Sequence, residues 1–283
     1  MCRLLAVVSP VPRPPRKVLG DAVVDVYRSM SRLHADGWGA AWIEDADDGG
    51  VPVLRSHRSP SSAADDPAFD ERTVSPSRAT LFHLRWASTG MDVTGLNAHP
   101  FVTDGVAVAH NGLIGPASEV EELLPDDVRD LPRGTTDSER MAALIHHHLR
   151  TGADLGEAVA LATGALRERF PASSLNMLAL SGTTLVVVRA SADAVADTDG
   201  MRAAGLTDDT APASHLGGGY FRMGVRRFDD GSLAFSSSGI PRDGFQLLPD
   251  ETVTAVDLAT LRIDQRPVVP GASEPAATAT IPA

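Results

Sequence analysis

Short apolar runs separated by turn-forming residues recur along the chain, and they constrain its fold more than any other feature of the sequence. Each run is long enough for one β-strand, and glycine-containing turns join several of them. The sequence therefore predicts a strand-rich domain whose first strand begins directly after Cys2. The expected strands occupy residues 3–9, 38–44, 51–57, 79–85, 105–110, 174–181, 183–190, 219–226, 232–237, 252–257 and 261–267.

Helical patterns appear between these runs. Apolar residues recur at helical spacing over 18–33, which predicts one amphipathic helix there. Thr136 and Glu139 form a capping box that opens a second helix running through His148. A third helix is expected at about 154–169.

Three segments carry neither pattern. The proline-rich stretch up to Pro15 is expected to be a loop, and residues 60–77, rich in Ser, Pro, Ala and Asp, are expected to be a mobile excursion. The end of the chain, 269–283, is mostly Pro, Ala, Thr and Gly, a composition typical of disorder. We therefore expect one domain over 2–268 and a disordered C-terminal tail after it.

Composition narrows the classes of partner. The chain has 283 residues, a net charge of −12 and a pI of about 5.1, which oppose affinity for nucleic acid phosphates or an anionic membrane. Its one cysteine can form neither an internal disulfide nor a thiolate metal cluster. The apolar segment from Leu4 to Val8 is too short for a secretion signal. We expect a cytoplasmic protein with a small-molecule substrate and no nucleic acid or membrane partner.

Three consecutive histidines, His146, His147 and His148, suggest a metal site at first sight. Consecutive helix positions point in three different directions, so these side chains cannot converge on one ion. The glycine-rich segments also lack the pattern of a phosphate-binding loop. We therefore expect no metal and no cofactor.

Cys2 offers two reagents on one residue if it becomes the mature N-terminus. A thiol has a reference pKa of about 8.5 and an α-amine one of about 7.7–8.0. The amine can then act as the base that activates the thiol of the same residue. On position alone, the plainer explanation is favoured, that Cys2 is a small residue that precedes a strand.

Several motifs follow Cys2 in a defined order, and together they resemble the class II glutamine amidotransferases of the N-terminal nucleophile superfamily. The motifs are Met1-Cys2-Arg3, His83-Leu84-Arg85-Trp86-Ala87-Ser88-Thr89-Gly90, Asn97-Ala98-His99-Pro100, His110-Asn111-Gly112 and Thr136-Asp137-Ser138-Glu139. The resemblance covers roughly residues 2–150. It implies an α+β fold of four layers, αββα, with two packed antiparallel sheets between helix layers and Cys2 as the nucleophile once Met1 is removed.

The resemblance also implies roles for single residues. The side-chain amide of Asn111 and the backbone N–H of Gly112 would form the oxyanion hole. Arg85 would grip the α-carboxylate of glutamine with its planar guanidinium fork, and Asp137 would bind the α-ammonium group.

Further pocket residues are implied by the same motifs. Trp86 and Ser88 would line the glutamine pocket through backbone and hydroxyl contacts, and His99 would help to shape it. Each motif also has a plain structural explanation: an Asn-Gly turn, a surface arginine at a strand end, and an acidic residue in the first turn of a helix.

The implied activity is cleavage of the γ-glutamyl amide bond of glutamine or of a γ-glutamyl compound, through a γ-glutamyl thioester on Cys2. The Met-Cys-Arg start and the Asp-Gly-Trp-Gly loop resemble the stand-alone γ-glutamyl amidohydrolase of ergothioneine biosynthesis. The His-Leu-Arg-Trp-Ala-Ser and Asn-Ala-His-Pro segments look more like general amidotransferases. Because no synthase domain is expected after the strands, two alternatives stay open: a glutaminase subunit that supplies ammonia to a separate synthase, and a catalytically silent module that senses glutamine.

Overall fold

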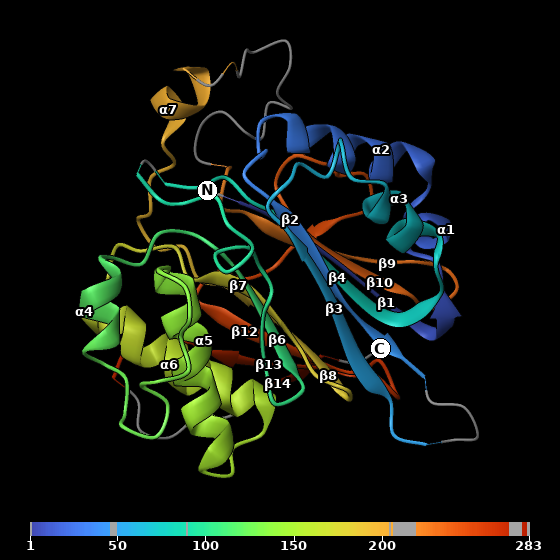
Figure 1. Cartoon of the computed structure of the whole chain (residues 1–283). Helices are drawn as coiled ribbons and strands as arrows, with labels where there is room; N and C mark the ends of the chain where they lie inside the picture. Colours follow the sequence, from blue (N-terminus) through green and yellow to red (C-terminus); the bar gives the residue numbers. More distant parts are fainter. Residues whose placement is uncertain are drawn as a thin grey trace.

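Two β-sheets of seven strands each are stacked face to face, and helices cover the outer face of each sheet (Figure 1). The α+β fold of four layers, αββα, that the sequence predicts is thereby confirmed. The computed structural model describes residues 2–45, 50–88, 90–203, 205, 219–271 and 279–281.

The elements fall into four groups by layer. The first sheet contains β1 (Arg3–Arg13), β2 (Trp38–Glu44), β3 (Val53–Ser59), β4 (Ser77–Leu84), β9 (Met223–Arg227), β10 (Leu233–Ser237) and β11 (Gln246–Leu247). The second contains β5 (Phe101–Thr103), β6 (Val106–Asn111), β7 (Asn176–Leu180), β8 (Thr184–Arg189), β12 (Thr252–Asp257), β13 (Ile263–Pro267) and β14 (Ala279–Ile281). The helices are α1 (Pro15–Leu19), α2 (Asp21–Ser29), the 3₁₀ turn η1 (Met30–Arg32), α3 (Pro67–Val74), α4 (Ala117–Glu121), α5 (Asp137–Arg150), α6 (Leu155–Arg169) and α7 (Thr198–Ala203).

The strand order places β1 in the middle of the first sheet, with β4 beside it. The first sheet has the order β11-β9-β10-β1-β4-β2-β3, and the second has the order β14-β13-β12-β8-β7-β6-β5. Figure 1 shows α1, α2 and α3 over the first sheet and α4, α5 and α6 over the second. None of the helices in the described ranges is long and apolar enough to cross a membrane.

Alternation along β1 decides which side chains face which layer. Leu4, Ala6 and Val8 are buried in the apolar layer between the two sheets, whereas Leu5 and Val7 are buried against α1, α2 and α3. Because both faces of β1 are covered, nearly every residue of its first half is apolar. The continuous apolar run that predicts this strand follows from that double burial.

β6 obeys the same rule in the second sheet. Ala107 and Ala109 face the first sheet, whereas Val108 packs on the helical side with residues of α5 and α6. Continuing this alternation turns His110 towards α5 and Asn111 towards β1. The small alanines of β6 allow the two sheets to approach closely here.

The expected helix over 18–33 is wrong as a single element. Gly20 has a φ of +85° and separates α1 from α2, and η1 completes the segment. The apolar residues that suggested one helix, including Val18, Val24 and Met30, do share one buried face. The spacing of apolar residues predicts this shared face, but it does not predict the break at Gly20.

The two later helices are confirmed as α5 and α6. The Oγ1 of Thr136 accepts a hydrogen bond from the backbone N–H of Glu139 at 3.1 Å, as expected of an N-cap. The Glu139 carboxylate accepts from the backbone N–H of Gly134 at 2.6 Å. Side chains on both sides of the helix start therefore fix where α5 begins.

Two segments expected to be irregular are partly regular. β1 continues through Arg13, with a shift of register after Val8, because the two prolines in this stretch are exposed and occupy an irregular part of the strand. Residues 60–77 contain α3, whose N-cap is Asp66; the Asp66 side chain accepts from the N–H of Ala68 at 3.0 Å. The predictions of a loop and of a mobile excursion are wrong for these residues.

The C-terminal tail is described only in part. Residues 272–278 and 282–283 lie outside the described residues. Ala279–Ile281 forms β14, which pairs with β13, so these three residues are not disordered. The remaining expected strands are present with shifts of a few residues, and the short elements β5, β11 and α4 carried no pattern that predicted them.

At Gly39 in β2, the first sheet lies very close to the loop before β5. A Cβ built there would lie 2.1 Å from the carbonyl oxygen of His99 and 2.6 Å from that of His57. Replacing Gly39 with alanine is therefore expected to lower the free energy of unfolding by about 2 kcal/mol, measured by urea denaturation. Gly95→Ala is the matched control, because a Cβ at Gly95 meets no described atom within 4 Å. Equal losses in the two variants would contradict this explanation.

Candidate active site

The site lies where the start of β1 meets the end of β6. The alternation of both strands directs Cys2 and Asn111 into the layer between the sheets. The backbone nitrogen of Cys2 donates a hydrogen bond to Oδ1 of Asn111 at 2.8 Å. The structure therefore brings together two expected catalytic residues that stand 109 positions apart in the sequence.

The amide nitrogen of Asn111 is an unused donor. Its Oδ1 is occupied by Cys2, which turns Nδ2 to the other side of the amide plane. Nδ2 is buried and has no hydrogen-bond partner within the described part of the chain. Most buried amides find an acceptor, so this donor is available to an acceptor that is not part of the chain.

Gly112 has no room for a side chain. A Cβ there would lie 2.0 Å from the carbonyl oxygen of Ser174 and 2.7 Å from Nε2 of His110. Ser174 also donates through Oγ to the carbonyl of Asn111 at 2.9 Å. These contacts hold the backbone of the Asn-Gly pair in place beside Cys2.

The thiol of Cys2 is easier to ionise than an ordinary thiol. Burial raises the pKa of Cys2, but attraction to the His83 ring and to the chain's N-terminus, with hydrogen bonds to His83 and the Trp86 backbone, brings this pKa down to about 6. The sulfur also lies 3.9 Å from the carbonyl oxygen of Trp86. A thiol with this pKa is largely thiolate at neutral pH.

His83 is a site residue that sequence reasoning missed, although it begins one of the motifs. On β4 it pairs with Leu4 of β1, and its Nε2 lies 3.1 Å from the carbonyl oxygen of His110. The alternation of side chains along β4 was the available signal. Leu81, His83 and Arg85 are two positions apart, so their side chains lie on the same face of the strand, and Leu81 is buried in the layer between the sheets.

His99 stacks on His83, with ring centroids 4.1 Å apart. Burial, followed by repulsion from His83 and His110, lowers the pKa of His99 well below its ordinary value. Neither of its ring nitrogens has a hydrogen-bond partner among the described residues. His99 is thus a neutral aromatic ring behind His83, and its part in shaping a glutamine pocket stays a prediction.

Arg85 reaches across two loops. Its guanidinium donates to the carbonyl oxygens of Asp36 at 3.2 Å and Asp92 at 3.3 Å, and its backbone N–H donates to Gly37 at 2.8 Å. Burial lowers its pKa, and the Cys2 thiol and Asp36 act in the opposite direction. Arg85 thus lies within electrostatic reach of Cys2, while two of its N–H groups hold the surrounding loops.

Asp137 is engaged with backbone groups. Its Oδ2 accepts from the N–H of Ile114 at 2.7 Å, and its Oδ1 accepts from the N–H of Ser138 at 2.7 Å. The carboxylate therefore ties the turn that carries Gly112 to the first turn of α5. The chain's own N–H groups take up part of its accepting capacity.

Trp86 and Ser88 have different environments. Trp86 is partly buried and packs with Leu33, Tyr220 and Phe221 in a small apolar cluster. Ser88 is exposed in the loop that follows β4, and its carbonyl accepts from Met91 at 3.0 Å. The structure thus places Trp86 beside the nucleophile and leaves Ser88 at the surface.

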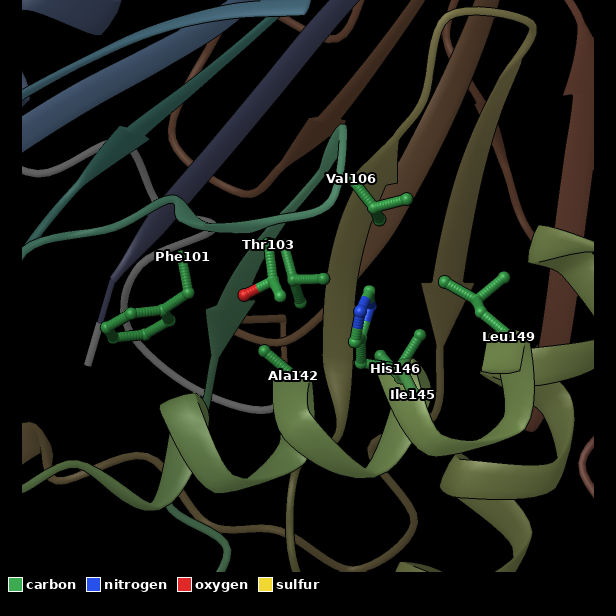
Figure 2. Close-up of a pocket in the computed structure, with 8 residues that line it drawn as sticks. Phe101, Thr103, Val106, Ala142, Ile145, His146 and Leu149 are labelled. Carbon is green, nitrogen blue, oxygen red and sulfur yellow. The ribbon is translucent and has the colours of Figure 1, made fainter. Parts of the chain in front are cut away.

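The three consecutive histidines point to different partners. Nε2 of His146 lies 2.8 Å from Asp104, and Nδ1 of His147 lies 2.7 Å from Asp127. His146 also lines a cavity of about 10 Å³ between α5 and the β5–β6 hairpin, next to Phe101 (Figure 2). That volume holds about one water molecule, so this cavity cannot accept glutamine. In the described ranges, no three His, Cys, Asp or Glu side chains gather as a metal site.

Comparison with known families agrees with this geometry. The family model for class II glutamine amidotransferases matches residues 1–198. The chain belongs to the class II glutamine amidotransferases. The resemblance stated from the sequence motifs is thereby confirmed.

Relatives of this amidotransferase segment occur in longer enzymes. The glutamine–fructose-6-phosphate aminotransferase (isomerizing) of Xylella fastidiosa is 32% identical over 146 residues, which are 52% of this chain and 23% of the relative. The protein of the same name from Rhizobium meliloti is 27% identical over 218 residues, 74% of this chain and 33% of the relative. The chain thus spans a minor part of the length of these curated relatives.

Solved structures share the fold over almost the whole chain. A glutamine aminotransferase class-II domain protein from Silicibacter pomeroyi has a TM-score of 0.59 at 18% identity, covering 95% of this chain and all of that one. A glutamine phosphoribosylpyrophosphate amidotransferase from B. subtilis has a TM-score of 0.61 at 14% identity, covering 94% of this chain and 49% of that one. At this identity the similarity establishes the fold alone.

The lowered thiol pKa predicts how Cys2 responds to pH. Only the thiolate reacts with iodoacetamide, so the alkylation rate of Cys2 should rise with a midpoint at about pH 6. His83→Asn removes the attraction that lowers the pKa, so the midpoint should move to higher pH. His148→Asn, a change on α5, serves as control and should leave the midpoint in place. Identical profiles in both variants would contradict the role of His83.

Proposed function

We propose that this amidotransferase domain, residues 2–268, hydrolyses the γ-glutamyl amide bond of glutamine or of a γ-glutamyl compound, with Cys2 as nucleophile. The observation that carries the proposal is the hydrogen bond between the Cys2 nitrogen and Asn111 Oδ1, which leaves Asn111 Nδ2 as a buried donor without a partner. A nucleophile and an unused donor side by side suit acyl transfer. Met1 lies outside the described residues, and its removal stays a prediction.

In the first half of the proposed reaction, the Cys2 thiolate attacks the γ-carbonyl carbon. The proton from the thiol is held on the α-amino group of Cys2. The negative oxygen of the tetrahedral intermediate accepts hydrogen bonds from Asn111 Nδ2 and the N–H of Gly112. As the carbon–nitrogen bond breaks, the Cys2 ammonium protonates the departing amine, and a γ-glutamyl thioester remains on the sulfur.

In the second half, water attacks the thioester. The neutral α-amino group of Cys2 takes a proton from that water, and the same oxyanion hole serves again. The carbon–sulfur bond then breaks, glutamate leaves, and Cys2 returns to its thiolate and ammonium form. The balance needs no cofactor and no metal ion.

Recognition of the glutamate head group is assigned to Arg85 and Asp137. An arginine has five N–H groups, and the carbonyls of Asp36 and Asp92 use only part of them, so a carboxylate can still bind. Trp86 and His99 are assigned to the walls of this pocket, and Ser88, which is exposed in the loop after β4, is assigned to its outer edge. We expect the reaction to take place in the cytoplasm, where a free thiol stays reduced.

A second candidate is a glutaminase subunit that passes ammonia to a separate synthase. The size of the curated relatives favours it, because the matching segment is only 23% of the Xylella fastidiosa aminotransferase. A third candidate, a silent module that senses glutamine, would keep the pocket but show no turnover. The intact set of Cys2, Asn111 and Gly112 speaks for catalysis.

Glutamate release from glutamine and from a panel of γ-glutamyl amides and peptides tests the proposal. Native protein with Met1 removed should release glutamate, and Cys2→Ala should release none. Release from one γ-glutamyl compound far above glutamine identifies a stand-alone hydrolase, whereas release from glutamine alone favours the ammonia-supplying subunit. Equal release by native protein and Cys2→Ala would exclude the scheme.

Asn111→Asp separates the two functions of the asparagine side chain. A carboxylate can still accept from the Cys2 nitrogen, but it cannot donate to an oxyanion. The variant should lose about 10²–10³ in kcat, measured as glutamate release, because one oxyanion donor is gone. Complete alkylation of Cys2 in the same variant is the control for an intact nucleophile. Unchanged kcat would remove Asn111 from the oxyanion hole.

A further inference from the structure

A cavity of about 430 Å³ opens between α7, the loop after β8 and the residues that lead into β9. A volume of this size can hold an amino acid or a larger group. Figure 1 shows α7 on the same side of the molecule as the start of β1. The polar side chains that line the cavity are Arg189, Ser191, Thr198, Arg202, Arg222 and Asp250.

Contacts through Tyr220 and Phe221 join this cavity to the active site. Both residues line the cavity and pack in one cluster with Trp86, whose carbonyl lies beside the thiol. The guanidinium of Arg3 lies 3.7 Å from the centre of the Tyr220 ring and donates to the carbonyl of Cys2. Tyr220 and Phe221, both buried, thus form the wall shared by this cavity and the Trp86 side of the active site.

The cavity is cationic, although the chain as a whole has a net charge of −12. Arg189, Arg202 and Arg222 line it, and Asp250 is the acidic residue among the lining side chains. Asp250 is already engaged, because it pairs with Arg189 at 3.3 Å and accepts from the N–H of Ser191 at 3.1 Å. Arg202 pairs with Asp199 at 3.7 Å, so Arg222 is the lining arginine for which the described residues show no ion pair.

Arg242 adds to this positive charge. Burial lowers its pKa, and repulsion from Arg222, Arg3 and Arg189 lowers it further. Arg222, Arg3 and Arg189 thus each lie close enough to Arg242 to repel it, and of these four Arg189 and Arg222 line the cavity. Such an arrangement is stabilised when an anion binds among the charges.

Several of these arginines also have N–H groups without an acceptor. Nε of Arg189, Nη2 of Arg242 and Nη2 of Arg3 are buried and make no hydrogen bond within the described ranges. The side chain of Arg189 is only 13% exposed, so solvent does little to satisfy it. Of these three arginines Arg189 lines the cavity, and because buried charged donors normally have partners, its unused Nε indicates that an acceptor from outside the chain belongs beside it.

We propose that this cavity is a subsite for an anionic group, a carboxylate or phosphate, on the leaving-group part of a γ-glutamyl substrate. The inference rests on the proposed function and names its substrate class. The planar fork of arginine matches the oxygen geometry of both groups. It follows that γ-glutamyl compounds with an anionic leaving part are better substrates than glutamine, whose leaving group is ammonia.

A matched pair of substrates tests the subsite: γ-glutamylglycine, which has a free carboxylate, and γ-glutamylglycinamide, which does not. Native protein should hydrolyse the carboxylate with a kcat/KM at least about tenfold higher. Arg222→Gln should bring the ratio of the two values towards one. Arg222 is exposed, so this change carries little risk to folding.

Arg227→Gln is the control variant. Arg227 is an exposed arginine at the opposite end of β9, paired with Leu233, whereas Met223 next to Arg222 pairs with Ser237 near the site. It should keep the native ratio. A native ratio of one, or the same ratio in both arginine variants, would overturn the subsite.

Calorimetric titration with inorganic phosphate, at constant ionic strength, separates the possible failures. Native protein should bind phosphate, and Arg222→Gln should bind it at least about tenfold more weakly. Phosphate binding without any substrate preference would mean that the cavity holds a free anion, which overturns its assignment to the leaving group. An inactive protein that still binds phosphate through Arg222 would contradict the proposed function and keep the anion site. Active protein with neither preference nor phosphate binding would contradict the anion site alone.

Discussion

The structure depends on the contact between the inner faces of its two sheets, where β1 meets β6. Along most of this contact the layer is apolar, with small residues such as Ala6, Ala107 and Ala109 that let the sheets approach closely. At one end the layer becomes polar, and the hydrogen bond from the Cys2 nitrogen to Asn111 closes it. Because packing of the whole layer sets this distance, the geometry of the candidate catalytic pair is a property of the sheet sandwich.

Burial and charge at that end have opposite effects on reactivity. Burial makes a charged thiolate unfavourable, which is the largest single effect on the pKa of Cys2, but the attractions of His83 and of the chain's N-terminus, together with hydrogen bonds, outweigh it. His99 stacks behind His83, and Asp137 holds the turn that carries Gly112. The polar groups around Cys2 are thus positioned by other buried contacts before any substrate arrives, which is the preorganisation that acyl transfer requires.

The cationic cavity extends this arrangement to the leaving-group side. In an acidic chain, arginines that converge on one cavity repel one another, and the energy of that repulsion is recovered only when an anion binds. Arg3 connects the two regions, since it contacts the Cys2 carbonyl and stacks on Tyr220 at the cavity wall. The same residues, Arg3 and Tyr220, would then help to position Cys2 and to form the wall of the proposed subsite.

The sequence by itself determined the strand-rich class, the later helices α5 and α6, and the family, because apolar periodicity, a helix cap and ordered motifs are local signals. It did not reveal the break at Gly20, the helix α3 or the part played by His83, since these depend on what a segment packs against. The cationic cavity was equally invisible, because Arg189, Arg202 and Arg222 come from separate segments of the chain and lone arginines carry no pattern. Only the tertiary structure decided those features, for the physical reason that sheet stacking, and not sequence spacing, sets which buried charges become neighbours.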